Sequence, residues 1–258
     1  MFFIIKELLR FKYLLYTLVN RDITKKYRRS FLGIIWSLLN PMMMMFITAM
    51  VFSTLFRFEI RNYALYLLIG QVVFTFYVES TVFAMNSILE NSALLKKIYV
   101  PKFLFPVARI LSSCMNFVFT LPAIFIIMLV TDAPFGGQTL LFVLPLVLML
   151  LFCMGVGMIL SACMVYFRDL GHIYGILLTA LNYATPIFYP ASIVPEKFQF
   201  LLWCNPLYYF VSMFRVILYD GCLPSAELVA ICSGLAATAL FIGFTVFGRL
   251  ENKFINYI

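Results

Sequence analysis

Long apolar runs constrain this chain more than any other feature of its sequence. Six runs, each near the length of about 20 apolar residues that a bilayer-crossing helix needs, alternate with polar or charged stretches. Hydrophobic residues make up 64% of the 258-residue chain and charged residues only 12%, an imbalance that no single water-soluble core can bury. We therefore expect an all-α membrane protein with six transmembrane helices. The predicted spans are residues 33–56, 63–85, 106–131, 139–166, 172–189 and 226–247.

Basic residues are distributed unevenly between the connecting segments, and this predicts the orientation of the chain. If the N-terminus is cytoplasmic, the inner segments hold 14 Lys and Arg residues and the outer segments hold four, which are Arg57, Arg61, Lys197 and Arg215. Cytoplasmic loops carry such an excess in membrane proteins. Six spans return the chain to its starting side, so both termini are expected inside. The net charge of +8 thus reflects topology, and no nucleic-acid partner is predicted.

The segment 1–32 is expected to lie outside the six-helix domain, which covers 33–258. Its apolar residues recur at helical spacing among basic ones, which predicts an amphipathic helix in the cytoplasmic interface. A basic turn or second short helix is expected from Arg21 to Arg29. Its basic side chains either anchor the segment to anionic lipid or bind phosphate groups of a cargo. The apolar positions are Ile4, Leu8, Phe11, Leu15 and Leu18, and the basic ones are Arg21, Lys25, Lys26, Arg28 and Arg29.

Two connecting segments carry further signals. A short helix is expected in the inner loop 86–105, from Glu90 through Lys97 to its end before Pro101, either as a docking surface or as a plain connector. The outer segment 186–220 is rich in proline and aromatic residues. Two apolar pieces near 196–203 and 207–219 are expected to enter the outer leaflet and return, with an interfacial aromatic belt as the alternative.

Several individual residues invite two interpretations. Glu79, the clear acid within a span, either faces a pore or is satisfied by a neighbouring helix or the inner interface. Cys204 and Cys222 share an outer loop and are either free or paired in a disulfide. Small residues at helical spacing give weak packing signals in two spans. These are Gly157 and Ser161 in the fourth span, and Gly234 and Thr238 in the sixth.

Motifs for catalysis and for nucleotide or metal binding are missing from the sequence. The Walker A pattern G-x-x-x-x-G-K-[ST] is absent, so the chain is not expected to bind ATP or to act as an enzyme by itself. Its single histidine, His172, and the spacing of its cysteines suggest no metal site. The 29 Phe and 15 Tyr residues suit the packing of sugar rings, although many membrane proteins are rich in Phe. No span shows a clear repeated polar face of the kind that a channel needs.

Five motifs occur in an order that resembles the polysaccharide ABC exporter permeases, the membrane subunits of O-antigen, capsule and teichoic-acid exporters. The resemblance covers nearly the whole chain, and its first motif is the most specific. The motifs are RDITKKYRRSFLG at 21–33 followed by WSLLNP at 36–41, LKK at 95–97 running to Pro101, YFRDL at 166–170, TPIFYP at 185–190 and NPL at 205–207.

The resemblance implies a homodimer of this chain with two copies of a separate P-loop ATPase, which would bind ATP and Mg while this chain carries no cofactor. The cargo would be a lipid-linked polysaccharide crossing the bacterial cytoplasmic membrane between the two copies, and the basic N-terminal residues would contact its phosphates. Coupling to the ATPase would use Glu90, Asn91, Leu94, Lys96, Lys97, Tyr99, Pro101, Arg168 and Asp169. The channel and its outer gate would use Trp36, Tyr77, Phe188, Tyr189, Tyr208 and Tyr209. The alternatives are an ABC exporter of drugs or simple lipids and a passive channel or membrane scaffold.

Overall fold

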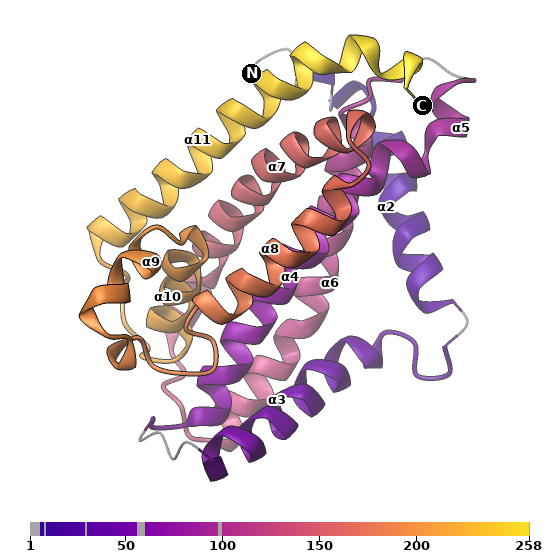
Figure 1. Cartoon of the computed structure of the whole chain (residues 1–258). Coiled ribbons are helices and arrows are strands. Elements are labelled where there is room, and N and C mark those ends of the chain that lie inside the picture. Colours follow the sequence, from indigo (N-terminus) through magenta and orange to yellow (C-terminus); the bar gives the residue numbers. More distant parts are fainter. Residues whose placement is uncertain (1–5, 8, 29, 56–59, 98–99, 258) are drawn as a thin grey trace.

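Long helices lying side by side form the body of the protein (Figure 1). The computed structural model describes residues 6–7, 9–28, 30–55, 60–97 and 100–257, and every regular element within them is a helix. Five helical segments in this part of the chain are long and apolar enough to cross a membrane. They are α3 (Ile35–Leu55), α4 (Tyr63–Glu90), α6 (Leu104–Val130), η1 and α7 (Gly137–Phe142 and Val143–Tyr166), and α11 (Ala226–Leu250) followed by η4 (Glu251–Asn256).

The fifth predicted span is a shorter helix than expected. Helix α8 (Leu170–Ala184) has 15 residues and a length of about 22 Å, and it ends before the predicted limit at residue 189. Pro186 explains this end, because proline lacks an N–H group and forces the preceding residue out of helical geometry. Thr185 accordingly has extended backbone angles.

Contacts at its two ends show that α8 still connects opposite ends of the bundle. Near its start, the Tyr174 hydroxyl donates to Thr81 in the second half of α4. Just beyond its end, the Phe188 carbonyl accepts from the Tyr63 hydroxyl at the start of α4. We call the end with Lys97 and Arg168 the basic end, and the other the distal end. The crossing is therefore a short helix continued by extended chain.

The proline-rich outer segment folds as a bent pair of helices at the distal end. It contains η2 (Ala191–Ile193), η3 (Glu196–Phe198), α9 (Gln199–Trp203) and α10 (Pro206–Leu218). The pieces Glu196–Trp203 and Pro206–Leu218 meet at 86° and together are apolar enough for a broken span or re-entrant loop. This confirms the prediction of two short apolar pieces.

The second predicted span ends five residues too early. Helix α4 continues through Asn86 and Ser87 to Glu90, which shortens the expected loop 86–105. Both polar side chains bond within the helix, since the Asn86 amide donates to the Val82 carbonyl and the Ser87 hydroxyl to the Ala84 carbonyl. The expected short helix is present only as the four residues of α5 (Ser92–Leu95).

The basic stretch of the N-terminal segment continues a helix where a break was expected. Helix α2 (Lys12–Tyr27) runs through the basic stretch, so the predicted turn or second helix after Arg21 is wrong. Phe11, Leu15 and Leu18 from the predicted apolar stripe pack into a hydrophobic cluster at the basic end, together with residues of α6 and η4. Of the remaining stripe positions, Ile4 and Leu8 lie outside the described residues.

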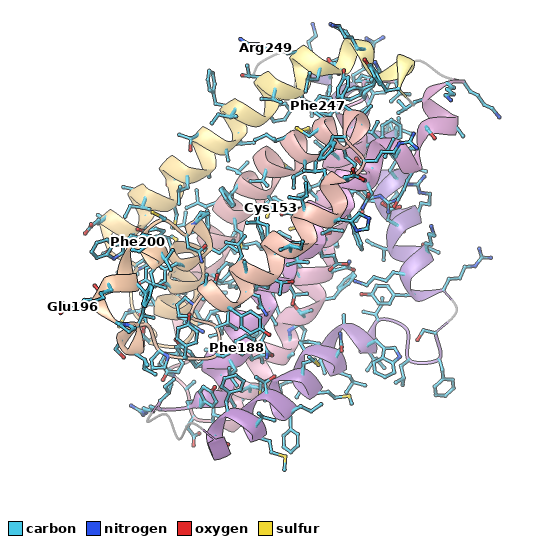
Figure 2. The ribbon with its side chains drawn as sticks, viewed as in Figure 1. Cys153, Phe188, Glu196, Phe200, Phe247 and Arg249 are labelled. Carbon is cyan, nitrogen blue, oxygen red and sulfur yellow. The ribbon has the colours of Figure 1, made fainter. Side chains whose placement is uncertain are left out.

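Helices α7 and α11 make the closest packing in the bundle, beside the core in which Figure 2 shows Cys153. A Cβ atom added to Gly155 would lie 2.2 Å from the Ala239 carbonyl carbon, and one added to Gly243 would lie 2.3 Å from the Gly155 carbonyl oxygen. Gly157 is also tightly packed, against Ala84 and Ile110. The predicted contact at Gly234 is wrong, because nothing lies within 4 Å of its Cβ position.

Candidate functional site

A groove of about 700 Å³ lies between α2, α3, α4 and α6 and reaches the end of α8. Its charged residues, Lys26 and Glu79, are paired with each other. The rest of its wall alternates apolar surface with neutral hydrogen-bonding side chains. The neutral polar residues are Ser37, Asn40, Thr48, Gln71, Thr75, Asn116, Thr120 and Asn182, and the aromatic ones are Tyr27, Trp36, Phe74, Phe76, Phe117 and Phe188.

Helix α4 contributes a polar row to this wall. Gln71, Thr75 and Glu79 are spaced four residues apart, so they lie on one face of the helix along about 12 Å. The Gln71 amide donates to Thr48 of α3 at 3.1 Å, while its buried Oε1 receives no hydrogen bond from the described residues. The expectation that no span carries a repeated polar face is therefore wrong for α4.

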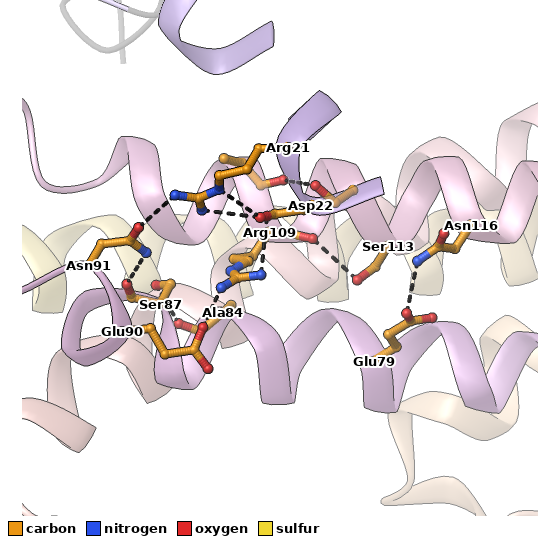
Figure 3. Close-up of polar contacts among 12 residues, drawn as sticks. Arg21, Asp22, Glu79, Ala84, Ser87, Glu90, Asn91, Arg109, Ser113 and Asn116 are labelled. Atoms are coloured by element: carbon orange, nitrogen blue, oxygen red, sulfur yellow. Dashed lines mark hydrogen bonds and ion pairs between the residues drawn. The ribbon is translucent and has the colours of Figure 1, made fainter. Parts of the chain in front are cut away.

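Glu79 stands at the centre of a four-residue polar group in the groove. Its Oε1 accepts from Lys26 Nζ at 2.6 Å and from Asn116 Nδ2 at 2.8 Å, and the second of these bonds is visible in Figure 3. The Tyr27 hydroxyl donates to Asn116 Oδ1 at 3.2 Å. Burial raises the pKa of Tyr27 above its ordinary value, which keeps this phenol a neutral donor. Neighbouring helices thus satisfy Glu79, as one of its two interpretations expected.

The position of Glu79 explains why α2 matters to the groove. Because α4 continues to Glu90, Glu79 lies eleven residues from the basic end of the helix, about 16 Å along its axis. In the last turn of α2, Lys26 binds Glu79 and Tyr27 binds the neighbouring Asn116 at this depth. Helix α2 therefore descends along α6 and carries the end of the basic stretch well into the bundle.

A second polar cluster, nearer the basic end, ties α2 to α4 and α6 (Figure 3). Arg21 donates to the Asn91 side chain at 3.1 Å and to Asp22. Arg109 of α6 forms ion pairs with Asp22 and with Glu90. Asn91 in turn donates to the Ser87 carbonyl. Asp22 is only 7% exposed, so this cluster fixes α2 against the end of α4 that leads into α5.

The chain matches the family model described as "ABC-2 type transporter" over residues 13–219, a stretch that runs from α2 to the end of α10. The chain belongs to the ABC-2 type transporter family. The match contains α2, the groove and the polar cluster at the basic end.

Relatives of this ABC-2 chain match it along nearly their whole length. The O-antigen export system permease protein RfbA of Myxococcus xanthus is 29% identical over 99% of both chains. A protein of the same name from Klebsiella pneumoniae is 26% identical over 95% of both. The polysialic acid transport protein KpsM of Escherichia coli is 22% identical over 92% of this chain and 93% of its own length.

The residues proposed for ATPase coupling in this ABC-2 chain fall into two groups. Glu90 and Asn91 are bound within the polar cluster, and Leu94 packs against the hydrophobic cluster at the basic end. Lys96, Lys97, Arg168 and Asp169 are exposed, and Pro101 is half-buried. The first pair follows α5 and the second precedes α8, and Figure 1 places α5 and the α7–α8 connection at the same end of the bundle. Tyr99 lies outside the described residues.

The basic residues expected to contact phosphate also divide. Lys26 lines the groove, whereas Arg21 belongs to the polar cluster. Lys25 and Arg28 are exposed on α2. Arg29 lies outside the described residues. The structure thus brings one of these side chains into the cavity of the ABC-2 fold.

The predicted channel and gate residues do not form one group. Trp36 and Phe188 line the groove. Tyr77 instead stacks on Phe152 in the core, with 5% of its surface exposed. Tyr189 lines a separate apolar pocket at the distal end. Tyr208 and Tyr209 lie on α10, where their rings make an edge contact and the Tyr209 hydroxyl donates to the Trp203 carbonyl.

Arg215 is a structural residue that the sequence analysis counted only as an outer charge. Its guanidinium, which is buried, donates to the carbonyls of Pro186, Ile187 and Tyr66 at 2.7 to 3.2 Å. It also lies 3.4 Å from the centroid of the Tyr66 ring. Arg215 therefore joins the bent segment to the broken end of α8 and to α4.

The sequence analysis also missed Asp22, Arg109 and Asn116. Asp22 is an acid within a strongly basic stretch, and Arg109 is a charge at the start of an apolar run. Asn116 follows Arg109 by seven residues, two helical turns, so both project from the same face of α6. An acid among bases and two polar residues at this spacing are signals that could have indicated a shared interface with α2.

Proposed function

We propose that this chain is the membrane-spanning permease subunit of an ATP-driven exporter of lipid-linked polysaccharide, of the O-antigen, capsule or teichoic-acid type. The observation that carries this proposal is the mixed wall of the groove, in which neutral hydrogen-bonding side chains are set within a largely apolar surface. Hydroxyl and amide groups interleaved with aromatic rings suit a polyhydroxylated chain, whose sugars offer both hydroxyl groups and apolar faces. The names of the relatives that match this chain along their length support the same cargo class.

The energy for transport would come from a separate P-loop ATPase, because the chain has no Walker A motif. The assembly would contain two copies of each subunit, with ATP and Mg bound by the partner. Lys96, Lys97, Arg168 and Asp169 would dock on it, because they are exposed at the basic end. Glu90 and Asn91 would support this surface from within and not touch the partner.

The protein would lie in the bacterial cytoplasmic membrane with the basic end and both termini inside. The beginning of α2 and the residues of η4 share the hydrophobic cluster at this end of the bundle, and Lys102 near the start of α6 donates to the Glu251 carbonyl of η4. Helix α3 is the natural surface for the second copy, because only 6% of its apolar window is buried within one chain.

Copurification tests the proposal. The tagged chain, expressed with its native neighbouring genes, is purified in mild detergent, and ATP hydrolysis is measured with and without lipid-linked glycan. We expect a stoichiometric P-loop ATPase whose rate rises with the glycan. Stimulation by a drug or simple lipid alone would favour the other type of ABC exporter. A chain that purifies alone and conducts ions would favour a passive channel.

A further inference from the structure

The four-residue group around Glu79 has the composition of a ligand site. It combines one cation, one carboxylate, one amide and one phenol, from α2, α4 and α6, on the wall of a groove. None of these side chains is needed to close a helix end. Lys26 is 43% exposed on its side chain, whereas Asn116 is 6% exposed, so the cation is the accessible member and the amide the fixed one.

We propose that Lys26, Glu79 and Asn116 bind a glycosyl phosphate, the point at which the first sugar of the cargo joins its phosphate. Lys26 takes the phosphate, and Glu79 with Asn116 takes hydroxyl groups of that sugar. This assignment deepens the proposed function and rests on it. Until cargo binds, Lys26 and Glu79 satisfy each other.

The site can select a phosphate that carries a sugar, because Lys26 and Glu79 would both change binding partners when the cargo enters. A phosphate oxygen that enters the groove competes with the Glu79 carboxylate for Lys26 Nζ, which leaves Glu79 with an unused acceptor beside Asn116. A carboxylate that has lost its cation and keeps only the Asn116 amide as a donor is costly at this depth. Sugar hydroxyl groups supply donors at that moment, so a phosphate that carries a sugar fits the site better than a bare phosphate.

The wall of the groove on the distal side of Glu79 also carries neutral polar side chains. Thr75 and Gln71 follow Glu79 toward the distal end on the same face of α4. The buried Gln71 Oε1 receives no hydrogen bond from the described residues, so it too can accept from a sugar hydroxyl. The first sugar would therefore lie at Glu79, with the following part of the glycan directed along this polar row.

Trp36 offers a direct readout, because it lines the groove and the only other tryptophan, Trp203, is exposed at the distal end. A full-length Trp203→Phe chain in nanodiscs, assembled with its ATPase, leaves Trp36 as the reporter within this subunit. Changes in its fluorescence on titration give binding curves. The fluorescence of tryptophans in the ATPase is removed by replacing those residues, or it is measured in a complex that carries Trp36→Phe and subtracted. The probes are farnesyl diphosphate, farnesyl diphosphate carrying one N-acetylglucosamine, and free N-acetylglucosamine.

We expect the glycosylated diphosphate to bind about tenfold more tightly than farnesyl diphosphate, and the free sugar to bind far more weakly than either. Lys26→Met should weaken both diphosphate probes about tenfold. Glu79→Gln should remove the preference for the glycosylated probe. Asn116→Ala should reduce the same preference while the Lys26–Glu79 ion pair remains. This second variant keeps the site testable if Glu79→Gln does not fold. Lys12→Met, which removes an exposed charge elsewhere on α2, should leave all affinities unchanged.

Three results would overturn the site. One is a wild-type chain without preference for the glycosylated probe. Another is a preference that survives in both Glu79→Gln and Asn116→Ala. The third is a Glu79→Gln chain whose affinities for the two diphosphates rise by the same factor, because Glu79 would then only restrain Lys26. Export of glycan by the wild-type complex, measured in the same preparations, separates this failure from that of the proposed function. Export with no effect of the variants refutes the site alone, whereas absence of export refutes the function.

Discussion

Arg215 shows how one side chain can determine the shape of a whole segment. The break in α8 at Pro186 leaves carbonyl groups without helical partners, and buried carbonyl groups need donors. The guanidinium supplies them from a single planar group. Sequence reasoning placed this residue outside the membrane because it evaluated charge by position along the chain, and its three acceptors come from distant segments.

Replacement of Arg215 by methionine should destabilise the protein by about 3 kcal/mol, because the carbonyls that it binds would lose their donors in a buried place. Thermal unfolding of the detergent-solubilised protein measures the effect. Arg215→Lys should recover part of it, since one ammonium group cannot reach all three carbonyls. Lys197→Met, an exposed charge in the same outer segment, is the control and should melt with the wild type. Equal melting of Arg215→Met and wild type would contradict this role.

The positions of the long helices could be predicted from the sequence, but the helices that pack against each of them could not. The lengths of the apolar runs predicted every long helix, because a helix that crosses a bilayer needs about 20 apolar residues and such runs are visible in the sequence. Run length could not reveal the polar row on α4, because Gln71, Thr75 and Glu79 are separated by apolar residues and other polar side chains of α4 lie outside their face. Their common face becomes meaningful only when α2, α3 and α6 are placed around it.

The contact between α7 and α11 gives a sharp test of packing. Gly155→Ala should destabilise the protein, because the added methyl group would collide with the backbone of α11 at Ala239. We expect a loss of about 1 to 3 kcal/mol from overpacking, measured by thermal unfolding. Gly234→Ala is the matched control on α11, where the added carbon meets nothing within 4 Å and alanine favours the helix. A stabilised Gly155→Ala chain would show that the two helices can separate freely.

At the basic end, the residues that stabilise the fold can be distinguished from the exposed residues that would dock on the ATPase. Lys97→Ala and Arg168→Ala change exposed side chains, so they should lower the glycan-stimulated ATP hydrolysis of the assembled exporter while the melting temperature stays the same. Glu90→Gln should lower the melting temperature as well, because it weakens the contact with Arg109. Comparison of the two readouts for each variant distinguishes the groups. Full ATPase stimulation in both Lys97→Ala and Arg168→Ala would refute the docking assignment.

For the whole molecule, the even number of crossings predicted from charge distribution depends on α8. Its 15 residues fall short of a standard span, yet its contacts join the two ends of α4. The surroundings of α3 could not be predicted from periodicity, because its polar residues Ser37, Asn40 and Thr48 indicate one face toward the groove but not what covers the rest of the helix. Only the packed structure reveals that it is left largely uncovered.

Cysteine labelling tests this topology. Cys204 and Cys222 are free and exposed in the distal segment, whereas Cys153 and Cys232 are buried. A membrane-impermeant maleimide applied to intact spheroplasts should label the wild-type chain, and the double variant Cys204→Ser/Cys222→Ser should not be labelled. A reducing agent added beforehand shows whether the two thiols pair in the cell. Labelling only after the membrane is opened would place the distal end in the cytoplasm.

The depth of Glu79 has a consequence for the kinetics of transport. Helix α4 is about 42 Å long, longer than the hydrocarbon layer of about 30 Å, and Glu79 lies about 4 Å from its midpoint. The electrostatic barrier to moving an ion across a bilayer is highest near its centre. Fixed polar groups at that height would replace one tall barrier by two lower ones with a resting place between them. A headgroup could then cross in two short steps, and the slower step would set the turnover of the exporter.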